Sequence, residues 1–489
     1  MLTLIAGAVG LPMPANRTTR LEFCPTVANL TGSDELKVAR SYEFALPLVL
    51  MGATLDVSLR MVQDNYLNVT RDTFVNTFAH VLKFPTPDFR GVVNPNVDTL
   101  YSSAFLDVGQ EPVVLTIPKA DHRSRYGLFQ IMDFWTNVIG NPELLYKEQV
   151  VCISLAPHLV SDDYTPCPDD NMNITIVSNT TNLWLLGRTA PLEGGDLVST
   201  NALQLQYQLR GLSSDDPNPA WDSSADSSLS ARDIVNSMSA LEFFGNATQL
   251  MVDNKPTADD APFMADVWPV VEESSEATLM AGAEKAGTLL QCQALNLTEW
   301  TEEYRLLRWP IPRPRSWLGI SGSVGTYGTD YPVRAVIADV GLGANLPEDA
   351  VYFVKPFLFG GCNYTLTLSP PPPVDSARGF WSITTYVDQY LVADPRNGTQ
   401  AAVVSSLQND IVIEKNGNAV IYIQASDPGE GKNWLYVPED VHGTNLTLTA
   451  RFYLPTAEIY PDRTWTPPMI EVSRSGPLRR PQCQWPWAD

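Results

Sequence analysis

The chain has 489 residues, which is too long for one ordinary hydrophobic core, so two or three domains are expected. Its net charge of −23 would be repelled by phosphate groups, and this argues against a general nucleic-acid binder or a protein that binds anionic membranes. Hydrophobic residues make up 44% of the chain, as in globular proteins, whereas charged residues make up only 18%. This sparse charge is more typical of an extracellular protein than of a cytosolic one.

The first fifteen residues, MLTLIAGAVGLPMPA, are apolar but lack the positively charged start of a secretory signal. Their alternation predicts a strand that is buried on both faces, either in its own subunit or, as the sharper hypothesis, in the sheet of a neighbouring copy. No run of eighteen apolar residues occurs, so no membrane-spanning helix is expected. The candidate assembly residues lie here and in the basic C-terminal tail: Leu2, Leu4, Ile5, Val9, Leu11, Arg479, Arg480, Trp485 and Trp487.

A long helix is expected next, since Ser33 or Asp34 can cap it and apolar residues follow at helical spacing. Pro47 should kink or divide this helix, and a second helix is expected near 72–80. Short β-branched and aromatic runs, separated by Pro, Gly, Asn and Asp, then predict strands. These runs cover residues 99–108, 111–118, 126–135, 149–155, 173–178, 183–188 and 202–209.

The second half repeats the change from helix to strand. Residues 213–229 read as a polar loop, the stretch from 231 to about 307 is helical in pattern, and prolines after Arg308 end it. A helix from Val333 ends in glycines, and strand patterns return from 350 to 472, including residues 409–415. The expected units are an apolar extension (1–32), a helix plus β-sandwich domain (33–212), a helical connecting region (213–345), a second β-sandwich domain (346–472) and a basic Pro/Trp-rich tail (473–489).

Ten Asn-x-Thr triplets are the most informative motif, because none has Pro in the middle and all end in Thr. Each is an acceptor for an N-linked glycan if the chain enters a secretory pathway, although chance matches in a Thr-rich chain are the alternative. The acceptors are Asn16, Asn29, Asn68, Asn173, Asn179, Asn246, Asn296, Asn363, Asn397 and Asn445. The pattern predicts a surface covered by sugars almost from end to end.

Six cysteines, an even number, favour up to three disulfides in a glycoprotein, with free buried thiols as the alternative. They are Cys24, Cys152, Cys167, Cys292, Cys362 and Cys483. Fifteen pairings are open, and the one local suggestion is Cys152 with Cys167, which flank a short turn-rich stretch. No C-x-x-C spacing occurs and no His lies near a Cys at ligand spacing, which argues against zinc and thioredoxin-like sites.

Seven stretches carry a resemblance to a known family. They are NPNVDTLYSSAFLDV (94–108), PVVLTIP (112–118), RYGLFQIMDFWTNVIGNP (125–142), GFWSITTYVDQYLV (379–392), NWLYVPED (433–440), RFYLP (451–455) and WTPP (465–468). In this order they resemble the two-domain proteins that consist of domain of unknown function 1254 (N-terminal) and domain of unknown function 1214 (C-terminal). The resemblance implies two jelly-roll-like β-sandwich domains joined by a helical region, a mainly β fold with helical segments (α+β). It implies almost nothing about activity.

Four carboxylates inside these stretches are candidates for chemistry: Asp98, Asp107, Asp133 and Asp388. A pair of them could hydrolyse glycosidic bonds if the fold brought the two groups close together. Asp98 follows Asn96 in a turn, and the alternative for it is a local role, as a cap or a hydrogen-bond partner of the backbone. Asp133 lies between aromatic residues in a strand, where a buried carboxylate needs a partner such as Arg125. These two residues are the weak catalytic candidates, and a structural ion pair is the favoured interpretation.

Aromatic residues at alternating strand positions could stack sugars, although such residues more often belong to a core. They are Tyr126, Phe129, Phe134, Trp135, Phe380, Trp381, Tyr386, Trp434, Phe452 and Tyr453. No metal site is predicted, because the histidines His80, His122, His158 and His442 form no ligand pattern. No cofactor is expected; calcium is considered only for the acidic loops 161–171 and 213–218, which lack the spacing of an EF-hand.

The sequence therefore favours a secreted, heavily N-glycosylated structural protein that assembles head-to-tail into an extracellular filament or surface layer. In such an assembly the N-terminal strand would enter the neighbouring subunit, and contacts that do not close into a ring extend into fibres. The partners expected are copies of the chain and covalent glycans, with no nucleic acid and no membrane span. Two alternatives stay open: an extracellular hydrolase that acts on glycans or esters, although no catalytic motif is recognisable, and a carbohydrate-binding protein.

Overall fold

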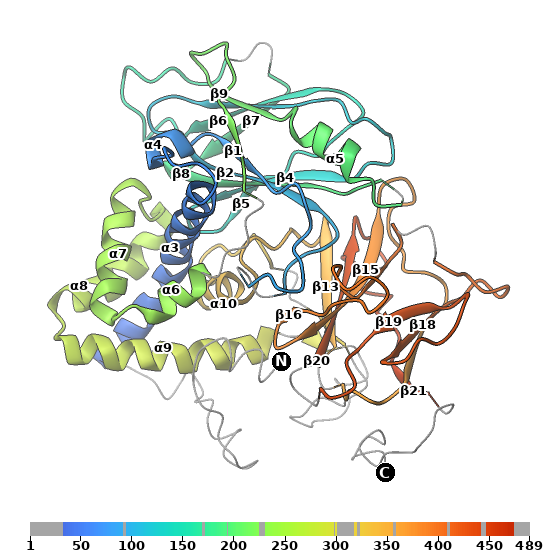
Figure 1. Ribbon diagram of the computed structural model, residues 1–489. Coiled ribbons are helices and arrows are strands. Elements are labelled where there is room, and N and C mark those ends of the chain that lie inside the picture. Colours follow the sequence, from blue (N-terminus) through green and yellow to red (C-terminus); the bar gives the residue numbers. More distant parts are fainter. Residues whose placement is uncertain are drawn as a thin grey trace.

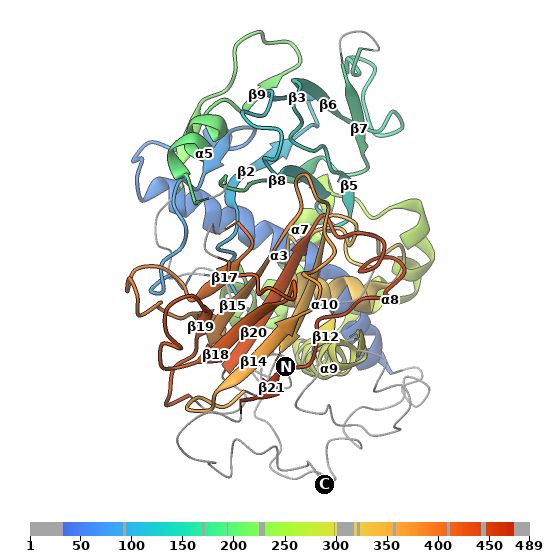
Figure 2. The same cartoon turned by 90° about the vertical axis from the view of Figure 1, so that its right-hand side faces the viewer.

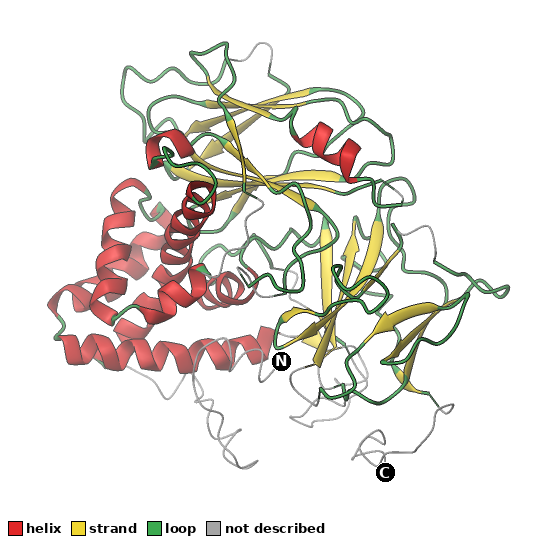
Figure 3. Ribbon diagram, viewed as in Figure 1, coloured by secondary structure: helices red, strands yellow, loops and turns green. Residues whose placement is uncertain are grey.

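The computed structural model describes residues 33–90, 94–168, 172–192, 194–223, 230–297, 299–300, 317–319, 323–355, 358–407, 411–441 and 446–473. The predicted N-terminal strand and residues 474–489 of the basic tail, with all nine candidate assembly residues, lie outside these ranges. Within them the fold is α+β: two pairs of sheets and one group of helices (Figures 1 and 3).

Two sheets of the N-terminal half pack face to face (Figure 1). The larger sheet has the strand order β10-β1-β2-β8-β4-β5, and the smaller sheet has the order β7-β6-β3-β9. The strands are β1 (Phe78–His80), β2 (Leu100–Asp107), β3 (Val113–Ile117), β4 (Gly127–Asp133), β5 (Val138–Gly140), β6 (Gln149–Leu155), β7 (Ile174–Ser178), β8 (Asn182–Thr189), β9 (Gln208–Gly211) and β10 (Ala220–Asp222). We call these two sheets the N-terminal sheet pair.

Alternation along β2 explains how the larger sheet serves two cores. Side chains two residues apart point to the same face of a strand. Ala104 and Leu106 therefore face the smaller sheet, where they join the same hydrophobic cluster as Leu115 of β3. Phe105 points the other way and joins a cluster with Met51 of the long helix α3 (Asp34–Gln63).

Helices cover the opposite face of the larger sheet (Figure 3). The central helix α3 contacts all the longer helices of this group: α6 (Ala231–Ser237), α7 (Ala240–Asp253), α8 (Ala261–Glu273), α9 (Glu276–Leu297) and α10 (Tyr331–Gly341). A 3-10 turn (Ala258–Asp260) precedes α8. As the sequence suggests, the Ser33 side chain caps α3 by accepting a 3.3 Å hydrogen bond from the amide of Leu36.

The helix α3 runs through Pro47 as a single element, so the proline does not divide it. Proline removes one intrahelical hydrogen bond, but Pro47 is buried and the packing of neighbouring elements holds this turn of the helix in place. Among the described helices, α3 alone has the length and hydropathy of a membrane span, with a mean hydropathy of 1.5 over the most apolar window. Of that window, 61% is buried inside the protein, as in the central helix of a globular protein.

The helix predicted near 72–80 is wrong. Only one helical turn forms, α4 (Arg71–Phe74), and the chain then enters strand β1. The reason is tertiary: Phe78 is buried in the core between the two sheets, while Ala79 and His80 pair with β2. Pairing and burial therefore outweigh the local helical pattern.

The strand predicted over 202–209 is also wrong in its first part, which is the end of helix α5 (Leu197–Gln204). The Asp196 side chain caps this helix by accepting hydrogen bonds from two backbone amides, a signal that the apolar alternation hid. The predicted polar loop 213–229 contains the short strand β10, which pairs with β1. Of the strand predicted over 409–415, the described residues 411–415 form no strand.

The C-terminal half contains the second pair of sheets (Figure 2). One sheet has the order β11-β12-β13-β20-β15-β16, with β17 also on β15, and the other has the order β19-β18-β14-β21. The strands are β11 (Glu299–Trp300), β12 (Leu318–Gly319), β13 (Ala350–Lys355), β14 (Tyr364–Leu368), β15 (Phe380–Val387), β16 (Tyr390–Leu391), β17 (Val403–Ser405), β18 (Ala419–Gln424), β19 (Asn433–Tyr436), β20 (Leu446–Tyr453) and β21 (Glu471–Val472). We call them the C-terminal sheet pair.

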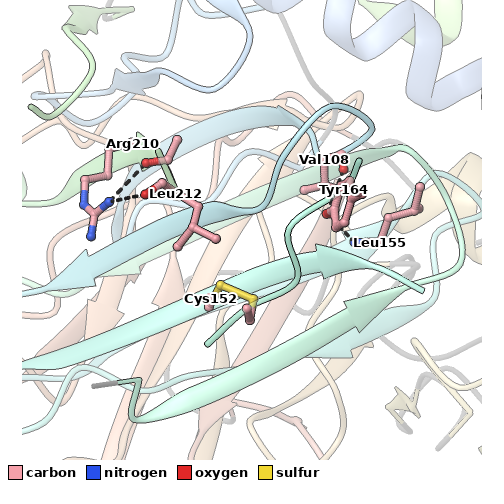
Figure 4. Close-up of a disulfide and its surroundings, with 8 residues drawn as sticks. Val108, Cys152, Leu155, Tyr164, Arg210 and Leu212 are labelled. Carbon is pink, nitrogen blue, oxygen red and sulfur yellow. Dashed lines mark hydrogen bonds between the residues drawn. A yellow bond between two sulfur atoms is a disulfide. The ribbon is translucent and has the colours of Figure 1, made fainter. Parts of the chain in front are cut away.

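A disulfide fastens the long loop between β6 and β7 (Figure 4). Cys152 on β6 bonds to Cys167, the local pairing considered from the sequence. Tyr164 holds the same loop, since its hydroxyl donates to the carbonyl of Val108 at 3.1 Å and accepts from the amide of Leu155 at 3.0 Å. Cys362 is also disulfide-bonded, and the side chains of the three remaining cysteines, Cys24, Cys292 and Cys483, lie outside the described part of the chain.

Candidate functional site

The C-terminal sheet pair packs against one end of the larger N-terminal sheet. On the face that meets α3, the larger sheet carries Phe105 and Trp184 at one end and Tyr101 and Arg188 at the other. Tyr101 and Arg188 are directly opposite each other on β2 and β8. The first two pack on the helices, whereas the other two lie toward the C-terminal sheet pair.

The C-terminal sheet contacts this end with its outer face. Side chains along β15 and β20 alternate between this outer face and the C-terminal core. Trp381 and Phe452 point into the C-terminal core. Ser382 and its cross-strand partner Arg451 point outward, toward the N-terminal sheet pair. Tyr453 lies beside them on the same face, and its ring stacks on that of Phe380 with the centroids 4.2 Å apart.

Asp98 lies at the centre of this junction. Its Oδ2 atom accepts a 2.7 Å hydrogen bond from the Ser382 hydroxyl and a 3.0 Å bond from the Tyr453 hydroxyl. The loop is shaped by Asn96, whose side-chain oxygen accepts a 2.6 Å bond from the Asp98 amide, as in an Asx turn. The turn expected at Asp98 is therefore present, but its carboxylate joins the two halves of the chain instead of bonding the backbone.

Arg451 completes the connection between the two halves. Its guanidinium donates to the carbonyl of Asn94 at 3.1 Å, to the hydroxyl of Tyr386 at 2.8 Å and to the hydroxyl of Thr384 at 3.3 Å. The Tyr386 hydroxyl in turn donates to the carbonyl of Pro95 at 2.8 Å. The loop that begins at residue 94 is thus held by side chains of the C-terminal sheet at Asn94, Pro95, Asn96 and Asp98.

The electrostatics show how the buried charges are tolerated. Burial raises the pKa of Asp98 above its ordinary value, and the nearby Arg451 and the two hydroxyl donors oppose this effect. Burial disfavours the charge of Arg451 as well, but Tyr386, Tyr453 and Asp98 outweigh it, so that the pKa of Arg451 lies above its ordinary value. Each charge therefore stabilises the other in a site that solvent barely reaches, since Asp98 is 4% exposed.

Arg188 makes a second set of connections, to the loop that follows α10. Its guanidinium donates to Oε1 of Gln130 at 2.8 Å and to the carbonyl of Gly343. Gln130 also donates to the carbonyl of Ala344 at 2.8 Å. The backbone amide of Asn345 donates to the hydroxyl of Tyr352 at 3.4 Å. The loop after α10 is therefore bound to the larger N-terminal sheet, through Arg188 and Gln130, and to β13 of the C-terminal sheet pair, through Tyr352.

We call this set of side chains the junction cluster. It comprises Asn96, Asp98, Tyr101, Tyr126, Gln130, Arg188, Tyr352, Ser382, Thr384, Tyr386, Arg451 and Tyr453. Most of its polar atoms bind one another, so the cluster joins the two sheet pairs. Its chemistry is that of hydrogen-bond recognition, with tyrosine hydroxyls, amides and guanidinium groups converging on one place.

Several polar atoms in or beside the cluster have no hydrogen-bond partner among the described residues. They are the hydroxyl of Tyr126, both amide atoms of Asn345 and the side-chain oxygen of Asn141. Tyr126 is 3% exposed and Asn345 is 1% exposed, so bulk water does not supply the missing hydrogen bonds. The nitrogen of Asn141 donates to Asp349, whose pKa is raised to about 7 by burial and by Glu348 and Glu143.

The two weak catalytic candidates lie apart, and the expected pairing of Asp133 with Arg125 is wrong. Arg125 binds Asp121, with its Nε donating to Oδ1 at 2.8 Å. Asp133 accepts from the amides of Trp135 and Asn137 at 2.9 and 2.8 Å. Burial raises the pKa of Asp133, and its bonds to Asn137 oppose that rise most strongly. Asp133 therefore closes a tight turn, a role that its position between aromatic residues does not reveal.

The other carboxylate candidates also have separate surroundings. Asp107 accepts a 2.8 Å bond from the amide of Gly109, and Asp388 lies at a positive φ of 50° in the turn between β15 and β16. No hydrogen bond joins any two of the four carboxylates among the described residues. Ten aromatic residues considered as a sugar platform are all buried, which is their core interpretation: Tyr126, Phe129, Phe134, Trp135, Phe380, Trp381, Tyr386, Trp434, Phe452 and Tyr453.

The metal-binding candidates are scattered as well. In the described ranges, no group of three His, Cys, Asp or Glu side chains gathers as a metal site would need. His80 is buried, bonds through Nδ1 to the Ser102 hydroxyl at 2.9 Å, and has a pKa lowered to about 4 by burial. In the acidic loops, the described Asp162, Asp163 and Asp216 are exposed.

Comparison with known proteins follows the same division into two halves. Residues 75–211 match the family described as "Protein of unknown function (DUF1254)", and residues 355–457 match "Protein of unknown function (DUF1214)". The chain thus carries the two domains DUF1254 and DUF1214, in that order. The resemblance drawn from the sequence is therefore confirmed, and the junction cluster takes Asp98 and Arg188 from the first matched range and Ser382 and Arg451 from the second.

One solved structure shares the fold of this chain. The crystal structure of the VPA0106 protein from Vibrio parahaemolyticus matches 90% of this chain and 100% of its own, with a TM-score of 0.60 and 17% identity. A putative uncharacterized protein from Burkholderia cenocepacia is aligned over 96% of this chain and 93% of its own, with a TM-score of 0.41 and 11% identity. No curated protein matches the sequence.

Sequence reasoning missed the residues that carry most of the junction: Arg188, Tyr352, Ser382 and Arg451. A signal was present, because LWLLGR and TARFY each place an arginine within a strand of otherwise apolar or small residues. A buried arginine needs several acceptors, and such a residue in a central strand predicts a polar contact on one face. For Arg451 one such partner is Asn94, 357 positions away in the chain, and the local pattern does not reveal it.

Proposed function

We propose that this chain is a secreted, heavily N-glycosylated structural protein whose copies assemble head-to-tail into an extracellular filament or surface layer. The observation that carries the proposal is the exposure of the glycan acceptors. Among the six acceptors whose burial is described, Asn68, Asn173, Asn179, Asn246 and Asn397 are exposed and Asn363 is half-buried. An N-linked glycan needs an acceptor on the surface, and each of these six meets that need at least in part.

The acceptors are also spread over every body of the fold. Asn68 follows α3, Asn173 and Asn179 flank β7, and Asn246 lies on α7. Asn363 and Asn397 lie in the C-terminal half, before β14 and before β17. Sugars at these positions would leave only limited bare faces for contact with other molecules. The disulfide between Cys152 and Cys167 is compatible with the same oxidising, extracellular setting.

The closed junction cluster supports a structural role over a catalytic one. An active site needs a group that substrate can reach, whereas Asp98, Arg451 and Tyr453 are 4%, 5% and 0% exposed, and hydrogen bonds within the protein engage all three. A cluster of this kind fixes the two sheet pairs into one rigid unit, which suits a repeating building block. The two pairs of face-to-face sheets also support jelly-roll-like domains. A jelly roll further requires a particular order of strand connections, and we propose that order from the family resemblance.

The assembly part of the proposal rests on the sequence. Residues 1–14 have the alternation of a buried strand. Main-chain hydrogen bonds to a neighbour's sheet, together with the burial of Leu2, Leu4 and Ile5, would stabilise the contact between two copies. Each such side chain contributes about 1.5–3 kcal/mol when fully buried. The cationic tail, with Arg479 and Arg480, would find an acidic surface on the next copy.

Two measurements test this function. In the first measurement, the protein is expressed for secretion in cultured eukaryotic cells. Peptide mass mapping after enzymatic removal of N-linked glycans should then show conversion of the acceptor asparagines to aspartate. Full-length protein and a chain lacking residues 1–14 are then compared by negative-stain electron microscopy. Polymers are expected only from the full-length protein. Unmodified acceptors would contradict the glycoprotein, and equal monomers from both chains would contradict the assembly.

A second function, binding of a carbohydrate or another small polyol, is favoured by the Tyr126 hydroxyl and the Asn345 side-chain amide, which have no hydrogen-bond partner among the described residues. Hydroxyl groups of a sugar could serve both. A panel of monosaccharides is screened by ligand-observed NMR against the natural protein, Tyr126→Phe and, as control, the exposed Tyr146→Phe. Binding that only Tyr126→Phe weakens is the expected result for this function. No binding by any sugar would exclude it, and an esterase and glycosidase screen with Asp133→Asn tests the hydrolase alternative.

A further inference from the structure

The smaller N-terminal sheet ends in a strand with an uncovered edge. In the order β7-β6-β3-β9, strand β7 pairs only with β6 among the described strands. Figure 2 shows β7 on the outer side of the N-terminal sheet pair. The edge of a sheet presents unpaired backbone groups and is a template for pairing with another chain.

The sequence of β7 lacks the usual protection of such an edge. From Asn171 to Asn182 the chain reads NMNITIVSNTTN, without one charged residue and without proline. Thr175 and Val177 are exposed, the latter to 49%. Short β-prone, uncharged segments of this kind pair readily with copies of themselves. The net charge of −23 does not protect the strand, because salt screens charges beyond about 8 Å at physiological ionic strength.

The opposite edge of the same sheet is protected by the protein itself. The amide of Asn218 donates to the carbonyl of Leu209 on β9 at 2.7 Å, so that the following loop continues the pairing. The Arg210 guanidinium binds three carbonyls of this turn, including that of Leu212 (Figure 4). The two edges therefore differ: β9 is covered by its own chain and β7 is not, within the described residues.

Two glycan acceptors bracket β7. Asn173 immediately precedes the strand and Asn179 immediately follows it, and both are exposed. The Asn173 side-chain oxygen accepts a 2.8 Å bond from the amide of Val150, which fixes the side chain at the strand end. Its amide nitrogen, the atom that would carry the sugar, makes no hydrogen bond within the described residues.

We propose that N-linked glycans at Asn173 and Asn179 shield the edge of β7 and prevent copies of this chain from pairing there. This inference rests on the proposed glycosylation and adds a purpose for two of its sites. Bulky sugars at both ends of a five-residue strand exclude a second strand sterically. Contacts between copies are then restricted to other surfaces, such as the one that the N-terminal segment would use.

The test compares full-length variants secreted from eukaryotic cells. Thr175→Ala with Asn179→Gln removes both flanking acceptors and keeps the Asn173 side chain in place. Asn68→Gln with Asn246→Gln removes two acceptors elsewhere and is the matched control. Light scattering after size-exclusion chromatography measures the associated fraction across protein concentrations, and hydrogen exchange reports on the amides of residues 173–179.

The edge variant is expected to show an associated fraction several-fold above the control, with slower exchange in β7. Adding Val177→Lys to the edge variant should return the fraction to the control value, because a charge on an edge strand opposes pairing. Equal association of edge variant and control, or no effect of Val177→Lys, overturns the inference. Peptide mapping of the natural protein distinguishes failure of the shielding from failure of the glycosylation. If Asn173 and Asn179 are unmodified, both this inference and the glycosylation of these sites are wrong. If they carry glycans but the edge variant does not associate, only the shielding is wrong.

Discussion

Tyr453 donates a 3.0 Å hydrogen bond to Oδ2 of Asp98, although the two residues lie 355 positions apart in the chain. Ser382 donates to the same oxygen, so one buried carboxylate receives two hydroxyls from the other half of the protein. Contacts of this kind decide whether the two sheet pairs unfold together or separately. The carboxylate is therefore the first place to test the junction.

Asp98→Ala should lower the free energy of unfolding by about 1–3 kcal/mol, because Ser382 and Tyr453 lose a buried acceptor. Urea unfolding measures this loss, with the exposed Asp440→Ala as control, which should change the free energy by less than about 0.5 kcal/mol. Combining Asp98→Ala with Tyr453→Phe should give a coupling energy of about 0.5–3 kcal/mol. Strict additivity of the two substitutions would show that the bond does not contribute.

Arg188→Met should cost about 2 kcal/mol or more, since the substitution leaves the Gln130 side-chain oxygen and the Gly343 carbonyl without their buried donor. Methionine keeps most of the side-chain length, so lost volume is a minor factor. Arg60→Met, at an exposed position of α3, is the matched control and should be nearly neutral. If both variants unfold at the same urea concentration, the loop after α10 is held by other contacts.

Asp349 predicts a specific pH dependence. Burial, Glu348 and Glu143 raise its pKa from 3.8 to about 7, so between these values the folded protein holds a proton that the unfolded chain releases. The stability contributed by the protonated carboxyl is complete below about pH 4 and is lost as the pH rises to about 7.

The variant Asp349→Asn cannot ionise, so its stability relative to the natural protein should rise between pH 4 and pH 7. One pKa unit corresponds to about 1.4 kcal/mol, which gives an upper limit of about 4 kcal/mol for the whole rise. Chemical unfolding at several pH values measures the difference, with Asp440→Asn as the exposed control. A difference that stays constant with pH would mean that Asp349 titrates normally.

Replacing Cys152 and Cys167 together by alanine should lower the free energy of unfolding by about 2–4 kcal/mol, because the bond closes a loop between residues 15 positions apart. The loop should also become more sensitive to limited proteolysis, although Tyr164 still anchors it through Val108. Tyr164→Phe in the oxidised protein serves as the comparison for the anchor alone. An unchanged unfolding midpoint in the double alanine variant would contradict this expectation.

Local patterns predicted most of the strands and the helical region. The runs TLYSSAFLDV and GFWSITTYV became β2 and β15, and the cap at Ser33 starts α3 as expected. Strong alternation and cap chemistry act within a few residues, so one sequence is enough to see them. The failures at 72–80 and 202–209 lie where distant pairing or a hidden cap outweighed the apolar pattern.

The site was visible only in part. Asp98, Ser382 and Arg451 all fall inside the family-like stretches, so those stretches did mark the right region. Their partnership depends on two sheet faces that meet after folding, and no spacing rule connects positions so far apart. Asp133 misled for a different reason: its hydrogen-bond partners, the amides of Trp135 and Asn137 and the Asn137 side chain, all belong to its own turn.

One sheet face serves two neighbours, the helices through Phe105 and Trp184 and the C-terminal sheets through Tyr101 and Arg188. A chain that ended after α10 would therefore leave Tyr101 and Arg188 without the C-terminal sheet pair that covers them. Such a fragment would also expose Tyr126 and Leu128, which pack with Phe380 and Tyr453 in the whole chain, and it is therefore expected to aggregate.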